Sequence, residues 1–114
     1  MRIDGFLLAR IAEDEAVARA ATHQKIAGPS HGSWNAGSAL LMVNDALGKV
    51  DRQHIARWDP TRVLAECAAN RRVVTTCGAI AFGTVPSAAL AMLVLQEMSM
   101  AYVDHPDYDE AWRP

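Results

Sequence analysis

A short run at the middle of the chain, His54 to Trp58, carries three side chains that could do chemistry. It reads HIARW and places an imidazole, a guanidinium and an indole just ahead of Asp59. A histidine near a carboxylate can act as a general base, and an arginine can hold an anionic substrate. The C-terminal run adds another imidazole and two aromatic rings. The candidate binding residues are His54, Arg57, Trp58, His105, Tyr108 and Trp112.

An enzyme or ligand-binding module is one hypothesis for these side chains. It would use His54, Arg57, Asp59, His105 and Asp107, and it requires the two histidines to converge on one pocket. The sequence contains no nucleophile motif, no glycine-rich phosphate loop and no metal-ligand spacing. We therefore expect no cofactor and no metal site, assign no catalytic residue, and lean against an enzyme.

The central helix must position several of these residues. Its predicted start, Asp59-Pro60, is a strong helix-start signal. An aspartate at the N-cap accepts a hydrogen bond from a free N–H of the first turn, and proline at the first helical position loses no partner. We expect this central helix to run from Asp59 to near Gly78 or Gly83, with Arg62 and Glu66 paired four residues apart.

Two further helices are predicted on either side of the central one. The first runs from Asp4 to about Thr22, with Asp4 as its cap and Glu15 set to pair with Arg19. The third runs from Ala88 to about Tyr102, with Ser87 as its cap. The spacing of Tyr108 and Trp112 in the tail indicates that these rings pack the tail back onto the body.

The segment between the first and central helices has a different composition. Residues 27–37 form a loop by composition, and we expect Trp34 within it to fold back on the core. Ser38–Val43 and Lys49–Asp51 resemble two short strands joined by a turn, although a helix through Leu40–Leu47 competes with that interpretation. The predicted fold is mostly helical α+β: three helices, with a small β-hairpin between helices one and two, in a single domain over residues 1–114.

Composition limits the compartment and the partners. The 114 residues carry a net charge of −2 and 51% hydrophobic residues, which disfavours nucleic acid as a partner. We expect no signal peptide, a cytoplasmic setting and no disulfide, because Cys67 and Cys77 would lie about 15 Å apart along one helix. Residues 73–96 carry no charge, but the break at residues 83–87 favours two helices over a membrane span.

The start of the third helix, AALAMLVL, is apolar on every side. A chain of this length has difficulty burying such a helix alone, so we expect a homo-oligomer or a host-protein partner. The predicted interface residues are Leu90, Met92, Leu93 and Leu95. This favours a protein that acts by protein–protein interaction or self-assembly.

A nucleic-acid-binding regulator is the remaining alternative. It would use four arginines, which helical geometry does not place on a single stripe. They are Arg57, Arg62, Arg71 and Arg72. Acidic residues at both ends of the chain also oppose this function.

Three motifs resemble those of a known family. They are DEAVARAAT (residues 14–22), HIARWDPTRVLAE (residues 54–66) and YVDHPDYDEAWRP (residues 102–114). In order and spacing they are similar to domain of unknown function family 6221, uncharacterised small proteins of actinobacteria and their bacteriophages. Trp58 stands where the family usually has histidine, and Asn70 where it tends to have lysine. The resemblance implies an actinobacterial or phage accessory protein in the cytoplasm, and it implies no activity.

Overall fold

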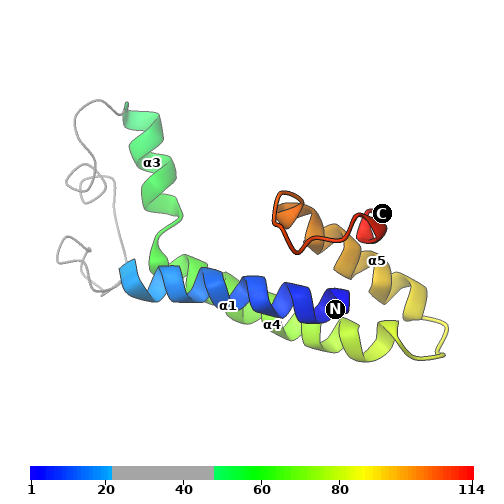
Figure 1. Ribbon diagram of the computed structural model, residues 1–114. Coiled ribbons are helices and arrows are strands. Elements are labelled where there is room, and N and C mark those ends of the chain that lie inside the picture. Colours follow the sequence, from blue (N-terminus) through cyan, green and yellow to red (C-terminus); the bar gives the residue numbers. More distant parts are fainter. Residues whose placement is uncertain (22–47) are drawn as a thin grey trace. The chain divides into compact units, whose positions relative to one another are not determined.

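The computed structural model describes residues 1–21 and 48–114. Contacts divide the chain into two compact units. The first unit joins Met1–Ala12 to Ala68–Pro114, and the second unit is Glu13–Cys67. The described elements are α1 (Ile3–Ala21), α3 (Lys49–Arg57), α4 (Pro60–Ala81), α5 (Ala88–Ser99), η1 (Met100–Tyr102) and η2 (Glu110–Trp112), as Figure 1 shows. The single-domain expectation stays a prediction.

Every element in the described part of the chain is helical, so the predicted α+β class and its β-hairpin are wrong. Lys49–Asp51, predicted as the second strand, forms the first turn of α3. Of its nine residues only Val50 and Ile55 are β-branched, and lysine, arginine, glutamine and alanine are good helix formers. The predicted strand Ser38–Val43, its helical alternative Leu40–Leu47 and the loop with Trp34 lie outside the described residues.

Helix α1 buries one side of its N-terminal half in the first unit. Ile3, Phe6, Leu7 and Ile11 are almost fully buried, and their spacing is that of one helical face. The helix begins at Ile3, so Asp4 lies inside the first turn and is not the N-cap that the sequence predicted. Its carboxylate instead accepts hydrogen bonds from the Arg2 guanidinium at 2.8 Å and from the Gly5 N–H at 2.9 Å.

Helix α4 starts as predicted. The Asp59 carboxylate accepts a hydrogen bond from the Arg62 N–H at 2.8 Å, and Pro60 is the first helical residue. The Arg62–Glu66 pair also forms, at 3.1 Å. On α1 the predicted Glu15–Arg19 pair forms at 3.6 Å. The predicted cap and the two predicted ion pairs are confirmed, because each depends only on residues within one turn of a helix.

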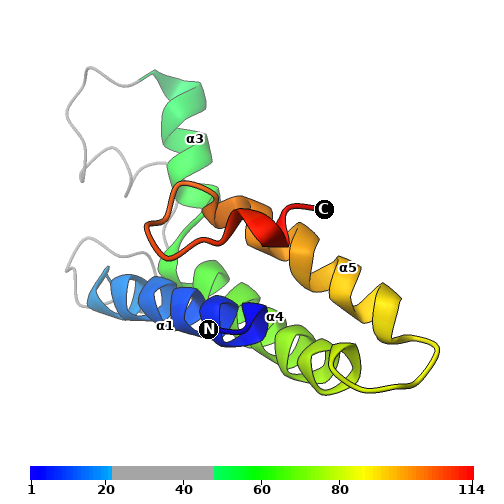
Figure 2. The same ribbon diagram turned by 45° about the vertical axis from the view of Figure 1, so that its right-hand side comes forward.

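Helix α5 buries one side and exposes another. Ala91, Leu95 and Ser99 are buried and lie four residues apart, whereas Leu90 and Leu93 are exposed. The helix begins at Ala88 as predicted, but Ser87 makes no side-chain capping bond. After η1 the chain turns, and the C-terminal segment runs back beside α5 (Figure 2). No helix of the described residues is both long enough and apolar enough to cross a membrane.

Within the first unit, α1 approaches α4 closely at Gly78. A Cβ atom built on Gly78 would lie 2.7 Å from Oδ2, 3.0 Å from Cβ and 3.2 Å from Cγ of Asp4. Asp4 cannot easily move away, because Arg2 and the Gly5 N–H hold its carboxylate. Glycine is therefore required here by space and not by an unusual backbone conformation.

Substitution of Gly78 by alanine should lower the free energy of unfolding, although alanine normally stabilises a helix interior by about 1 kcal/mol relative to glycine. We expect a net loss of roughly 1–2 kcal/mol, because the added methyl group overlaps Asp4. Gly5→Ala is the matched control, since its Cβ would meet only Met1 Cγ at 3.7 Å. Urea denaturation measures both variants. A Gly78→Ala protein as stable as Gly5→Ala would contradict this packing.

The Asp4 carboxylate should make stability depend on acid pH. The hydrogen bond from Arg2 lowers the pKa of Asp4 below its ordinary value of 3.8. The stabilisation is therefore complete above the ordinary pKa and is lost as pH falls through the lowered one. Between about pH 5 and about pH 3, the parent protein should lose more unfolding free energy than Asp4→Asn. Equal losses in the two proteins, measured by urea denaturation, would contradict the Arg2–Asp4 interaction.

Candidate functional site

The C-terminal tail surrounds one phenylalanine of α1. Phe6 has no exposed surface, and four rings lie around it. Their centroids are at 6.2 Å for Tyr102, 5.7 Å for His105, 6.1 Å for Tyr108 and 4.9 Å for Trp112. We call these five residues the Phe6 cluster. The prediction that Tyr108 and Trp112 pack the tail onto the body is confirmed.

A buried arginine borders the Phe6 cluster one turn further along α1. Arg10 is only 7% exposed, and its Nη1 atom lies within hydrogen-bonding distance of both ring nitrogens of His105. The same atom is 3.7 Å from Oδ2 of Asp107. The Asp107 N–H donates to His105 Nδ1 at 3.0 Å, so Nδ1 acts as an acceptor there. The Arg10 guanidinium thus links α1 to the turn formed by His105, Pro106 and Asp107 in the tail.

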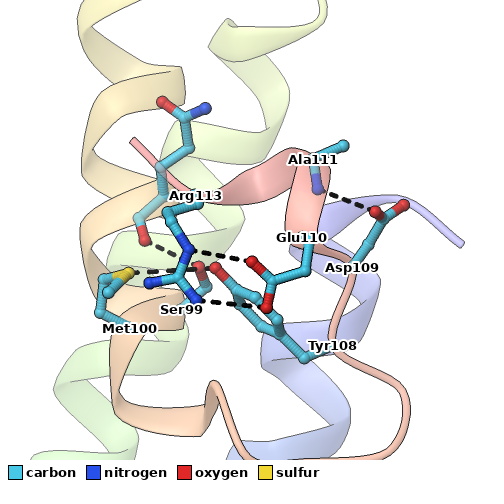
Figure 3. A network of polar contacts seen from close by, with 8 residues as sticks. Ser99, Met100, Tyr108, Asp109, Glu110, Ala111 and Arg113 are labelled. Carbon is cyan, nitrogen blue, oxygen red and sulfur yellow. Dashed lines mark hydrogen bonds and ion pairs between the residues drawn. The ribbon is translucent and has the colours of Figure 1, made fainter.

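The rest of the tail is held by short-range polar contacts, which Figure 3 shows. Asp109 accepts a hydrogen bond from the Ala111 N–H at 2.9 Å, which caps η2. Arg113 and Glu110 pair at 2.9 Å; this pairing lowers the pKa of Glu110 and raises that of Arg113. The Tyr108 hydroxyl points toward Met100 Sδ at 3.9 Å, which ties the tail to the end of α5.

The second group of candidate residues lies where α3 ends and α4 begins, inside the second unit. The Trp58 N–H donates to the carbonyls of His54 and Ile55, both at 3.2 Å, and so closes α3. The Arg62 guanidinium lies over the Trp58 ring, 4.1 Å from its centroid. The His54 and Trp58 ring centroids are 6.3 Å apart. Trp58 remains 43% exposed.

Trp58 lines two hollows in the second unit. A hollow of about 390 Å³ with both polar and apolar walls is lined by Val50, Gln53, His54, Arg57, Trp58 and Arg62. We call it the junction hollow. A mostly apolar one of about 240 Å³ is lined by Asp14, Val17, Ala18, Ala21, Trp58, Pro60 and Val63. The sequence predicted His54, Arg57 and Trp58 as neighbours, and the structure brings them together with Arg62.

The residues of the enzyme hypothesis do not share a unit. His54, Arg57 and Asp59 belong to the second unit, and His105 and Asp107 to the first. Each histidine is in contact with neighbours of its own unit, and Asp59 caps α4. Whether the six candidate residues bind a ligand stays a prediction. His105, Tyr108 and Trp112 contact the Phe6 cluster, His105 also contacts Arg10, and Tyr108 also contacts Met100.

The predicted interface residues of α5 differ in exposure. Leu90 is 65% exposed and Leu93 is 44% exposed. Met92 is half-buried and Leu95 is completely buried, so Leu95 contributes to the interior of the first unit and not to the exposed face. Neither Cys67 nor Cys77 forms a disulfide, as predicted.

Sequence reasoning missed Phe6 and Arg10, which are the centre and the border of the tail's packing. One signal was available. Arg10 interrupts the apolar run FLLARIA, and a charged residue on the buried side of a helix is rarely fully buried unless it is paired. The sequence of α1 itself, however, does not indicate that the residues in contact with Phe6 and Arg10 come from the C-terminal tail.

In its described part the chain is a small helical protein whose aromatic C-terminal tail packs on its first helix. It belongs to the family of unknown function DUF6221, whose family profile matches residues 1–114. The family membership predicted from the three motifs is therefore confirmed. No curated protein matches the chain, and no solved structure does.

Replacement of Trp112 by alanine should lower the free energy of unfolding by about 2–3 kcal/mol, because it removes the ring nearest to Phe6 and opens a void. The matched variant Trp58→Ala should cost at most about 1 kcal/mol, because that ring is 43% exposed. Thermal and urea denaturation measure both. If the two substitutions cost the same, or if Trp112→Ala costs nothing, the tail does not stabilise α1 as described.

Proposed function

We propose that this protein acts by self-association, through the exposed apolar side of α5. The observation that supports this is the pair Leu90 and Leu93, two large apolar side chains three residues apart on the solvent side of one helix. Val85, in the turn before the helix, is also half exposed at 51%. We call Val85, Leu90 and Leu93 the α5 face. Apolar side chains grouped on a surface are typical of contact sites.

The chemistry of the α5 face favours a second copy of the chain as the partner. Residues 73–96 carry no charged side chain, so the face has no charge pattern for a partner of opposite charge to match. In a two-fold dimer the same patch meets itself. An uncharged apolar helix face satisfies this condition, because leucine packs as well against leucine as against any other apolar side chain.

The local packing explains why the α5 face is available. The opposite side of the helix, with Ala91, Leu95 and Ser99, already fills the interior of the first unit. Burying both exposed leucines in a dimer would gain roughly 1.5–3 kcal/mol for each fully covered side chain. We place this assembly in the cytoplasm, which is supported by two cysteines that are not joined in a disulfide. The three family motifs support an actinobacterial or phage accessory role.

Glutamate substitutions test this proposal. Light scattering coupled to size exclusion should give the parent protein a mass of two or more 12.4 kDa chains. Leu90→Glu with Leu93→Glu should shift it to a single chain, because the charges would be buried unpaired in the interface. Circular dichroism should remain unchanged, since both residues are exposed in the isolated chain.

Val17→Glu is the control for added charge. Val17 is 72% exposed and lies on α1 in the second unit, so the substitution should leave the mass of the assembly unchanged. A parent protein that is a single chain at all concentrations would rule out self-association. If Val17→Glu dissociates the assembly as completely as the leucine substitutions do, the α5 face is not the interface.

A further inference from the structure

From the residues that line the junction hollow, we infer that it binds a small phosphate monoester. This site is independent of the proposed self-association. Residues with three kinds of hydrogen-bond donor line the hollow: the arginines Arg57 and Arg62, the histidine His54 and the glutamine Gln53. Among the residues that the structure describes, no carboxylate lines it.

One face of α3 supplies most of these groups. Val50, Gln53, His54 and Arg57 follow the spacing i, i+3, i+4, i+7, so they lie along one side of the helix. Packing does not account for this arrangement, because α3 buries none of its residues. The helix KVDRQHIAR also carries three basic residues against one acidic residue, so the helix as a whole has a net positive charge.

Arg62 is held in place before any ligand arrives. Its guanidinium lies over Trp58, its Nε donates to Glu66 at 3.1 Å and its Nη1 donates to the Arg57 carbonyl at 3.4 Å. Such an arginine loses little conformational entropy on binding. Glu66 balances the charge of Arg62, so Arg57 supplies the net positive charge that an anion would meet. Within the described part of the chain, no ion pair engages the Arg57 guanidinium.

The combination of groups favours a phosphate ester over inorganic phosphate. Guanidinium groups match the oxygen geometry of phosphate, and several donors can each take a separate oxygen. The volume of about 390 Å³ is more than a lone anion needs and falls in the range of small-molecule sites. The indole of Trp58 and the side chain of Val50 offer apolar contact to the organic part of the ester.

Asp51, the acidic residue of α3, does not line the junction hollow. Two carboxylates that follow α3 in the sequence also oppose an anion. Glu66 is paired with Arg62. Asp59 accepts the Arg62 N–H in the α4 cap. Neither lines the junction hollow, so the ligand meets the cationic side chains and not these acids.

Titration of the full ¹⁵N-labelled chain tests this inference. Adenosine 5′-monophosphate is the ester probe, with inorganic phosphate, adenosine and sodium chloride as comparisons at matched ionic strength. The ester should give saturable shifts at the Trp58 indole N–H and at the amides of residues 50–62, with tighter binding than inorganic phosphate. Absence of saturation, or equal binding of adenosine, would overturn the inference. Equal binding of inorganic phosphate would overturn its ester part.

Substitutions separate a site from general charge attraction. Arg57→Gln and His54→Gln should each weaken ester binding, Arg57→Gln by about tenfold or more, because a charged hydrogen bond is lost. Both variants should fold, since both side chains are exposed on α3. Arg72→Gln is the matched control: it removes an exposed guanidinium that lines another surface hollow, with Arg71, Thr75 and Thr76. If Arg72→Gln weakens binding as much as Arg57→Gln does, the junction hollow is not the site.

Discussion

The burial of one ring, Phe6, is the interaction on which the first unit depends. α1 alone would leave this side chain in water, and the rings that cover it come from the far end of the chain. Perpendicular and tilted ring contacts add about 0.5–1.5 kcal/mol each beyond the area that they bury. The Phe6 cluster therefore explains why Met1–Ala12 belongs to the same compact unit as Ala68–Pro114.

The other features of this unit follow from holding the start of α1 in place. His105 and Asp107 of the tail meet the guanidinium of Arg10 and so offset the cost of burying its charge. On the same helix, Asp4 approaches α4 closely enough that only a glycine fits at Gly78. α5 buries one side in this unit and leaves the α5 face to solvent. The α5 face is thus exposed because the opposite side of α5 fills the interior of the first unit.

Local features of the fold were predictable, and contacts over long sequence separation were not. The Asp59-Pro60 start and the Arg62–Glu66 pair depend on residues within one helical turn, and both are present. The first turn of α3, Lys49–Asp51, was mistaken for a strand because three residues beside a predicted turn are too few to show helical periodicity. Arg10 and His105 are 95 residues apart, and no local periodicity reports such a pairing. Of the candidate site, the sequence found the HIARW group but not the part played by Arg62.

The most direct test of this account is a nuclear Overhauser experiment on the aromatic side chains of the full chain. The account predicts cross-peaks from the Phe6 ring protons to those of Trp112 and Tyr108, whose ring centroids lie 4.9 Å and 6.1 Å away. Absence of these cross-peaks in a protein with the expected helical content would contradict the central claim that the C-terminal tail buries Phe6.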